Sequence, residues 1–126
     1  MSAERPAGLT THVLDTSRGR PAAGLRIDLL RLDADGRARP MKTVTTNADG
    51  RVDAPLLGPA EMQAGRYELV FHVGGYFSAA GGAQGAQTDP PFLDQVPVRF
   101  TIAEPSAHYH VPLLVSPYGY VTYRGS

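Results

Sequence analysis

Apolar and polar residues alternate along several short stretches of this chain, a pattern typical of half-buried β-strands. The stretch Leu25–Leu32 reads Leu-Arg-Ile-Asp-Leu-Leu-Arg-Leu, and Arg66–Val73 alternates in the same way. Apolar or β-branched runs of similar length predict six further strands. These strands are expected at Leu9–Leu14, Lys42–Thr46, Arg51–Leu57, Val96–Ala103, His108–Ser116 and Tyr118–Arg124.

Turn-forming residues separate these strands. The chain holds 14 glycines and 11 prolines, spread along its length. Asn47–Gly50 is predicted to be a hairpin connection, Gly81–Pro91 a flexible loop and Pro59–Gly65 the site of one helical turn. The only helix expected is Tyr76–Ala80. Turn signals every ~8–12 residues favour an all-β, two-sheet sandwich of about eight strands with one short helix.

The domain organisation is simple. The chain has 126 residues, which suits one domain with a sizeable core. Residues 1–8 are predicted to be a flexible N-terminal tail, and residues 9–126 a single domain.

The side chains of a strand alternate between its two faces. In the first strand, Leu9, Thr11 and Val13 share a face that should be core, and His12 lies opposite. In the strand at 108–116 the core face should be formed by Tyr109, Val111, Leu113 and Val115. The other face then carries His108, His110 and Pro112.

Alternation also separates the two faces of the other two predicted strands that carry reactive groups. In the last strand Val121 and Tyr123 should point to the core, so Thr122, Arg124 and Ser126 should point away. After the 47–50 turn, Val52 and Ala54 should point inward, and Arg51 and Asp53 outward. If these four strands share one sheet, four polar groups emerge from its non-core face: His12, Arg51, His110 and Ser126.

Charge and cysteine content narrow the function. Lys plus Arg and Asp plus Glu balance at 12 each, so nothing indicates a nucleic-acid partner or an anionic membrane surface. There is no cysteine, which excludes disulfides, thiol nucleophiles and thiolate metal ligands. No apolar run approaches the length of a membrane span, and no signal core precedes residue 9. The expectation is a cytoplasmic protein.

Several segments resemble the transthyretin-related 5-hydroxyisourate hydrolases of purine catabolism. They are Leu9–Asp15 (LTTHVLD), Asp49–Val52 (DGRV), Gly75–Phe77 (GYF), Pro91–Leu93 (PFL) and His108–Ser126, which ends in YRGS. Departures are Tyr118, Val115 and a Gly/Ala-rich 79–87 loop. The resemblance implies a transthyretin-like sandwich in which the first, fourth, seventh and eighth strands form one sheet. It also implies a homotetramer, a dimer of edge-to-edge dimers around a central channel.

The resemblance further implies hydrolysis of 5-hydroxyisourate to 2-oxo-4-hydroxy-4-carboxy-5-ureidoimidazoline without a cofactor or metal. The family's catalytic residues map onto His12, Arg51, His110 and Ser126. Substrate binding is expected from His12, Arg51, Ser126 and Arg124. Neutral imidazole can take a proton from water, and a guanidinium can stabilise charge on a carbonyl oxygen. The base among the histidines, the acting group of Ser126 and the role of His108 stay open.

The sequence is also compatible with other functions to different degrees. His108 and His110 could share a zinc ion with His12. A Ser/His/Asp mechanism lacks a nucleophile elbow. The alternative from another class is a non-enzymatic carrier of small, thyroid-hormone-type ligands, and its branch of the family lacks the YRGS end with His12. A carbohydrate-binding or adhesion sandwich is disfavoured by the absence of Trp.

Overall fold

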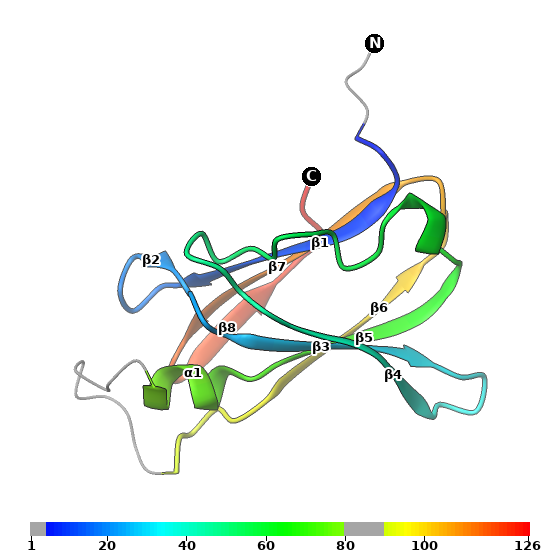
Figure 1. Ribbon diagram of the computed structural model, residues 1–126. Helices are drawn as coiled ribbons and strands as arrows, with labels where there is room; N and C mark the ends of the chain where they lie inside the picture. The colour runs from blue at the N-terminus through cyan, green and yellow to red at the C-terminus, as the bar shows by residue number, and fades with distance from the viewer. Residues whose placement is uncertain (1–4, 80–89) are drawn as a thin grey trace.

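The computed structural model describes residues 5–79 and 90–126, and it folds into two facing β-sheets with one short helix (Figure 1). The predicted all-β, two-sheet sandwich is confirmed. The elements are β1 (Gly8–Asp15), β2 (Arg20–Pro21), β3 (Arg26–Leu32), β4 (Ala38–Thr45), β5 (Gly65–Phe71), α1 (Val73–Ala79), β6 (Val96–Ile102), β7 (His108–Ser116) and β8 (Gly119–Thr122). A 3-10 turn covers Pro59–Glu61, inside the predicted helical turn. The helix α1 begins three residues before the predicted Tyr76.

The two sheets have four strands each. One has the order β2-β1-β7-β8, in which β1 and β7 run parallel and the other pairs are antiparallel. The second sheet has the order β4-β3-β5-β6 and is antiparallel throughout. The core lies between the sheets, where the predicted inward residues of β1 and β7 are all buried. The predicted assignment of core-facing and outward-facing residues in these two strands is therefore confirmed.

The last strand departs from its predicted parity. Val121 is 59 % exposed and Tyr123 is 54 % exposed, so neither points to the core. Thr122 pairs with the core residue Leu113 and therefore lies on the inward face. The period of two is correct here, but the assignment of the two faces is wrong.

Arg51–Leu57 is not a strand. The segment nevertheless runs along the edge of β1 opposite β7, where Leu9 N donates to Leu57 O at 2.9 Å and Leu56 N donates to Leu9 O at 2.8 Å. Within it, only Leu57 forms an isolated bridge, to Leu9. Pro55 has no backbone N–H and cannot donate to a β ladder. The predicted neighbour of β1 is therefore present as an irregular segment.

Residues 5–8 of the predicted tail lie against the first sheet. Gly8 begins β1, and the Pro6 carbonyl and the Arg5 guanidinium both contact the His108 ring. The tail prediction is therefore wrong for these residues, while residues 1–4 lie outside the described part of the chain. Most of the predicted 81–91 loop also lies outside the described residues.

A buried carboxylate ties α1 to the first sheet. Asp15, at the end of β1, is fully buried and accepts hydrogen bonds from the Tyr76 hydroxyl at 2.7 Å and the Ser17 hydroxyl at 2.6 Å. Burial and the Asp15 carboxylate raise the pKa of Tyr76 to about 12. Within residues 5–79 and 90–126, no helix is both long and apolar enough to cross a bilayer.

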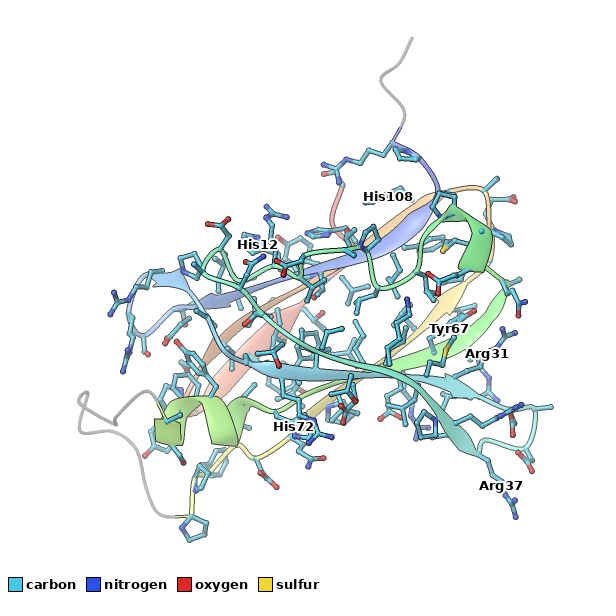
Figure 2. All side chains as sticks on the ribbon, in the orientation of Figure 1. His12, Arg31, Arg37, Tyr67, His72 and His108 are labelled. Carbon is cyan, nitrogen blue, oxygen red and sulfur yellow. The ribbon has the colours of Figure 1, made fainter. Side chains whose placement is uncertain are left out.

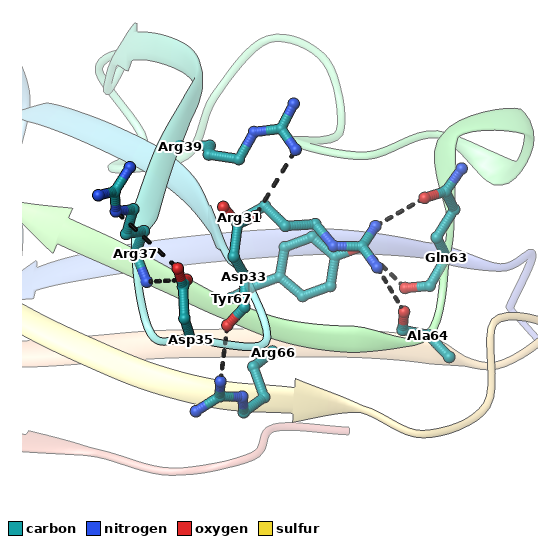
Figure 3. Close-up of polar contacts among 9 residues, drawn as sticks. All are labelled: Arg31, Asp33, Asp35, Arg37, Arg39, Gln63, Ala64, Arg66 and Tyr67. Carbon is teal, nitrogen blue, oxygen red and sulfur yellow. Dashed lines mark hydrogen bonds and ion pairs between the residues drawn. The ribbon is translucent and has the colours of Figure 1, made fainter.

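The β3–β4 end of the molecule is rich in arginine, and these arginines form hydrogen bonds and ion pairs with neighbouring residues of the same chain (Figure 3). The Arg31 guanidinium stacks on the Tyr67 ring and donates to Gln63 Oε1 at 2.6 Å and to Ala64 O at 2.8 Å. Arg66 donates to the Asp33 carbonyl at 2.8 Å. The Arg31 contacts tie β3 to β5 and the segment before it, and the Arg66 contact holds the start of the turn between β3 and β4.

Candidate functional site

Three histidines share the outer face of the first sheet. Parallel pairing sets Thr10 of β1 beside His110 of β7, and Gly8 beside His108. His12 follows on the same face of β1, two residues after Thr10. Figure 2 shows His12 and His108 along this face, away from the second sheet. The structure therefore brings together residues that are about 100 positions apart in the chain.

The His12 ring is held by the turn that precedes Arg51. Its Nε2 lies 3.0 Å from the Asp49 carbonyl oxygen. A carbonyl oxygen only accepts hydrogen bonds, so Nε2 carries the proton and neutral His12 keeps its lone pair on Nδ1. Burial and the charge of Arg51 lower the pKa of His12, although the hydrogen bond to Asp49 opposes this shift. Burial and the charge of Arg51 therefore favour the neutral form of His12.

A glycine allows this turn to approach β1 closely. Gly50 has a φ of 74°, and a Cβ there would collide with the Val13 carbonyl oxygen. The Gly50 carbonyl accepts a hydrogen bond from Val13 N at 2.8 Å. Asn47 Oδ1 accepts from the backbone N–H groups of Asp49 and Arg51. The turn thus places the Asp49 carbonyl and Arg51 beside β1.

The charge of Arg51 lowers the pKa values of both His12 and His110. After burial, its positive charge is the largest cause that lowers the pKa of His12 and that of His110. The Arg51 side chain is exposed and borders a hollow of about 150 Å³ whose walls include Thr10 and Pro55. This hollow gives a small ligand access to the guanidinium.

The His110 ring is half-buried between Thr10 and the C-terminal segment. Its Nδ1 lies 2.8 Å from the Thr10 hydroxyl. Burial lowers the pKa of His110, and the charges of Arg51 and Arg5 add to the effect. Two imidazoles with lowered pKa values therefore stand on one face of the sheet.

The end of the chain reaches the same histidine. Gly125 N donates to the His110 carbonyl at 2.7 Å, and the two residues form an isolated bridge that continues the β7–β8 register. Ser126 follows directly and is exposed. The structure thus places the terminal residue next to the His110 backbone, and its role in the site stays a prediction.

Arg124 lies on the other face of the sheet. Its guanidinium stacks over the ring of Tyr109, a core residue, at 4.2 Å and donates to the His108 carbonyl at 3.2 Å. It lines a mainly apolar hollow between β6 and β8. Within one protomer Arg124 anchors the C-terminal segment, and its predicted contact with substrate stays untested.

The sequence pattern indicates no role for Thr10 and leaves the role of His108 open. Thr10 contacts both His108 and His110, which no local pattern indicates because β1 and β7 are distant in sequence. In the described part of the chain, no group of three or more His, Cys, Asp or Glu side chains is arranged to hold a metal ion.

The fold and this outer-face cluster define a class of two-sheet β-sandwich proteins whose C-terminal segment borders a histidine site. The family model described as HIUase/Transthyretin family matches residues 9–125, and the chain belongs to this family. The predicted transthyretin-like fold is confirmed, since transthyretin of Sparus aurata superposes with a TM-score of 0.81 at 28 % identity, over 94 % of this chain and 97 % of that one.

Two enzymes are also similar to this chain. The 5-hydroxyisourate hydrolase 2 of Rhizobium meliloti (strain 1021) is 61 % identical over 118 residues, which cover 94 % of this chain and 95 % of the relative. The structure of Klebsiella pneumoniae 5-hydroxyisourate hydrolase has a TM-score of 0.74 at 35 % identity, and the match covers 94 % of this chain and 98 % of that one.

Proposed function

We propose that this protein hydrolyses 5-hydroxyisourate by opening its cyclic amide. The observation that carries the proposal is the placement of His12 and His110 on one sheet face, where burial and the charge of Arg51 lower the pKa of each. The similarity to enzymes named 5-hydroxyisourate hydrolase supplies the substrate.

The chemistry requires a base and a cation. A neutral imidazole takes a proton from water as the water oxygen attacks the amide carbonyl carbon. The carbonyl oxygen gains negative charge, which the Arg51 guanidinium stabilises. The C–N bond then breaks, and the proton held by imidazole passes to the leaving nitrogen. One water is consumed, and the carboxylic acid that forms releases its proton to solvent to become a carboxylate.

Ser126 is proposed to orient substrate or water from the end of the chain. Its support is the bridge between Gly125, the preceding residue, and His110. Arg124 is proposed to bind substrate if a neighbouring protomer completes the site, because its contacts within one protomer lie on the opposite face.

We also propose a homotetramer, formed as a dimer of edge-to-edge dimers. β8 is an edge strand, and it exposes Tyr120 and Val121, while Tyr123 just after it is also exposed. Exposed apolar side chains on an edge strand favour pairing with a second copy. Light scattering should give about four times the 13.5 kDa mass of the chain; a fully active monomer would argue against a shared site. A cytoplasmic location stays a prediction.

The test follows the absorbance decay of freshly generated 5-hydroxyisourate. His110→Asn should lower turnover by roughly 10²–10⁴-fold, the scale of a lost acid–base group. The matched control is His72→Asn, since His72 lies near the second sheet and pairs with Asp28 at 2.8 Å. Wild-type protein that binds the substrate without speeding its decay would favour the carrier function.

A further inference from the structure

A chain of hydrogen bonds leads away from His110 along the outer face of β1 and β7. His110 Nδ1 lies 2.8 Å from Thr10 Oγ1, and the same hydroxyl lies 3.3 Å from His108 Nε2. At the far end, His108 Nδ1 lies 3.2 Å from the Pro6 carbonyl oxygen. The chain thus joins two histidines through one threonine and ends on the backbone.

The Pro6 carbonyl determines which ring nitrogen of His108 carries the proton. A carbonyl oxygen only accepts, so His108 Nδ1 carries the proton and donates. The Nε2 of neutral His108 then holds a lone pair and can only accept. The Arg5 guanidinium, which can only donate, lies 3.3 Å from this nitrogen, as the Thr10 hydroxyl does, and the two donors share its lone pair.

The Thr10 hydroxyl links the tautomer of His108 to that of His110. A hydroxyl has one proton to donate. When Thr10 donates it to His108 Nε2, its oxygen accepts from His110 Nδ1–H. Neutral His110 therefore carries its lone pair on Nε2. The hydrogen bond at one nitrogen of an imidazole determines which tautomer the other nitrogen presents.

We propose that Thr10 and His108 are positioning residues that hold His110 as the Nδ1–H tautomer, with Nε2 as the general base. This inference rests on the proposed function. His12 is held in the opposite tautomer, because its Nε2 donates to the Asp49 carbonyl. The two site histidines therefore present different ring nitrogens to the site. The Asp49 carbonyl fixes the tautomer of His12, and the Pro6 carbonyl fixes that of His110 through His108 and Thr10.

The most direct test is the tautomer of His110 in the substrate-free protein. Two-bond ¹H–¹⁵N correlation spectra at a pH where the ring is neutral should show His110 protonated at Nδ1. This measurement needs neither a variant nor turnover. An Nε2–H tautomer in a wild-type enzyme that hydrolyses 5-hydroxyisourate would overturn the positioning role alone. Absence of turnover with the Nδ1–H tautomer present would instead overturn the proposed function.

A pair of substitutions separates the hydroxyl from the shape of the side chain. Thr10→Val keeps the β-branched form and removes the hydroxyl, whereas Thr10→Ser keeps the hydroxyl. In Thr10→Val we expect a mixture of His110 tautomers and a fall in kcat of roughly 10–10²-fold with little change in KM. This is less than the roughly 10⁴-fold loss seen when a catalytic histidine is left in the wrong tautomer. Thr10→Ser should keep the wild-type tautomer and remain within a few-fold of wild-type kcat.

Two results for the variants would refute the proposal. One is a Thr10→Val protein whose His110 stays entirely Nδ1–H, and the other is an equal loss of kcat in both threonine variants. If Thr10→Val does not fold, His108→Leu provides the second measurement. A leucine cannot accept a hydrogen bond, so the Thr10 hydroxyl becomes free to donate to His110 Nδ1, and we expect the Nε2–H tautomer of His110 to become populated. An unshifted tautomer in a folded His108→Leu protein would equally refute the role.

Discussion

Replacing Gly125 by alanine should disable the site while leaving the fold intact. Gly125 lies opposite His110 in the β7–β8 register. An alanine Cβ at this position would lie 2.6 Å from His110 Cδ2 and 3.3 Å from Cγ. Since carbon atoms pack best at about 3.5–4.0 Å, a displacement of roughly 0.9 Å is needed to relieve the closer contact.

Either way of making this displacement disturbs a hydrogen bond of His110. The ring cannot move away without disturbing the 2.8 Å hydrogen bond from His110 Nδ1 to Thr10, and the chain end cannot lift without breaking the 2.7 Å bond from Gly125 N to the His110 carbonyl. A misplacement of about 1 Å can cost about 10²-fold in rate, so kcat should fall roughly 10²-fold. Thermal stability should change little, because Gly125 lies outside the hydrophobic core.

The assay is the decay of 5-hydroxyisourate, with unfolding and light scattering as checks on fold and assembly. The matched control is Gly119→Ala at the start of β8. There the nearest atom to a new Cβ is Ser116 Oγ at 4.0 Å, and neither glycine has a positive φ. A folded, assembled Gly125→Ala protein with the kcat of the control would refute the reasoning, because the position of neither the ring nor the chain end would then matter.

Three further predictions follow from the contacts of the site and the helix. Activity should persist below pH 6.5 and decline only as pH falls through the lowered pKa values of the site histidines. Arg51→Gln should move this acid limb of the pH–rate profile to higher pH, because the positive charge that it removes opposes protonation of the histidines. An acid limb that stays in place in the variant would contradict this. Gly75→Ala should raise the free energy of unfolding by about 0.5–1 kcal/mol, because its Cβ meets nothing within 4 Å in α1. Gly74→Ala should lower it, because its Cβ would come within 3.0 Å of neighbouring backbone; urea unfolding of the pair is the test, and equal shifts would count against it. Deleting Ser126, or extending the chain beyond it with a bulky tag, should reduce turnover in protein whose circular dichroism and mass are unchanged, whereas full activity would remove Ser126 from the site.

The sequence predicted β1 and β7 well and β8 poorly, for one physical reason. In β1 and β7 the buried face is apolar and the other face carries histidines, so the two faces differ clearly. In β8 and the two residues after it, the apolar Val121 and Tyr123 face outward, while Thr122 and Arg124 face the other sheet. Apolar side chains favour any surface that excludes water, so their pattern identifies a face without identifying the core.

The segment Arg51–Leu57 illustrates a second difficulty. Its composition resembles that of a strand, and its place beside β1 was expected from the family resemblance. Its backbone nevertheless makes only scattered hydrogen bonds to β1, and Pro55 cannot extend a ladder. Whether a segment becomes a strand depends on the partner available along its whole length, and that partner is set by tertiary packing.

The sequence by itself determined that His12 and His110 project from the face opposite the core, because alternation with a period of two is local to each strand. Only the tertiary structure decided what each histidine meets there. The parallel register of β1 and β7 placed Thr10 between His108 and His110, and the Gly50 turn brought the Asp49 carbonyl to His12. Register and turn packing depend on segments that are distant in the chain, and these contacts assign the ring protons that a one-dimensional pattern leaves undefined.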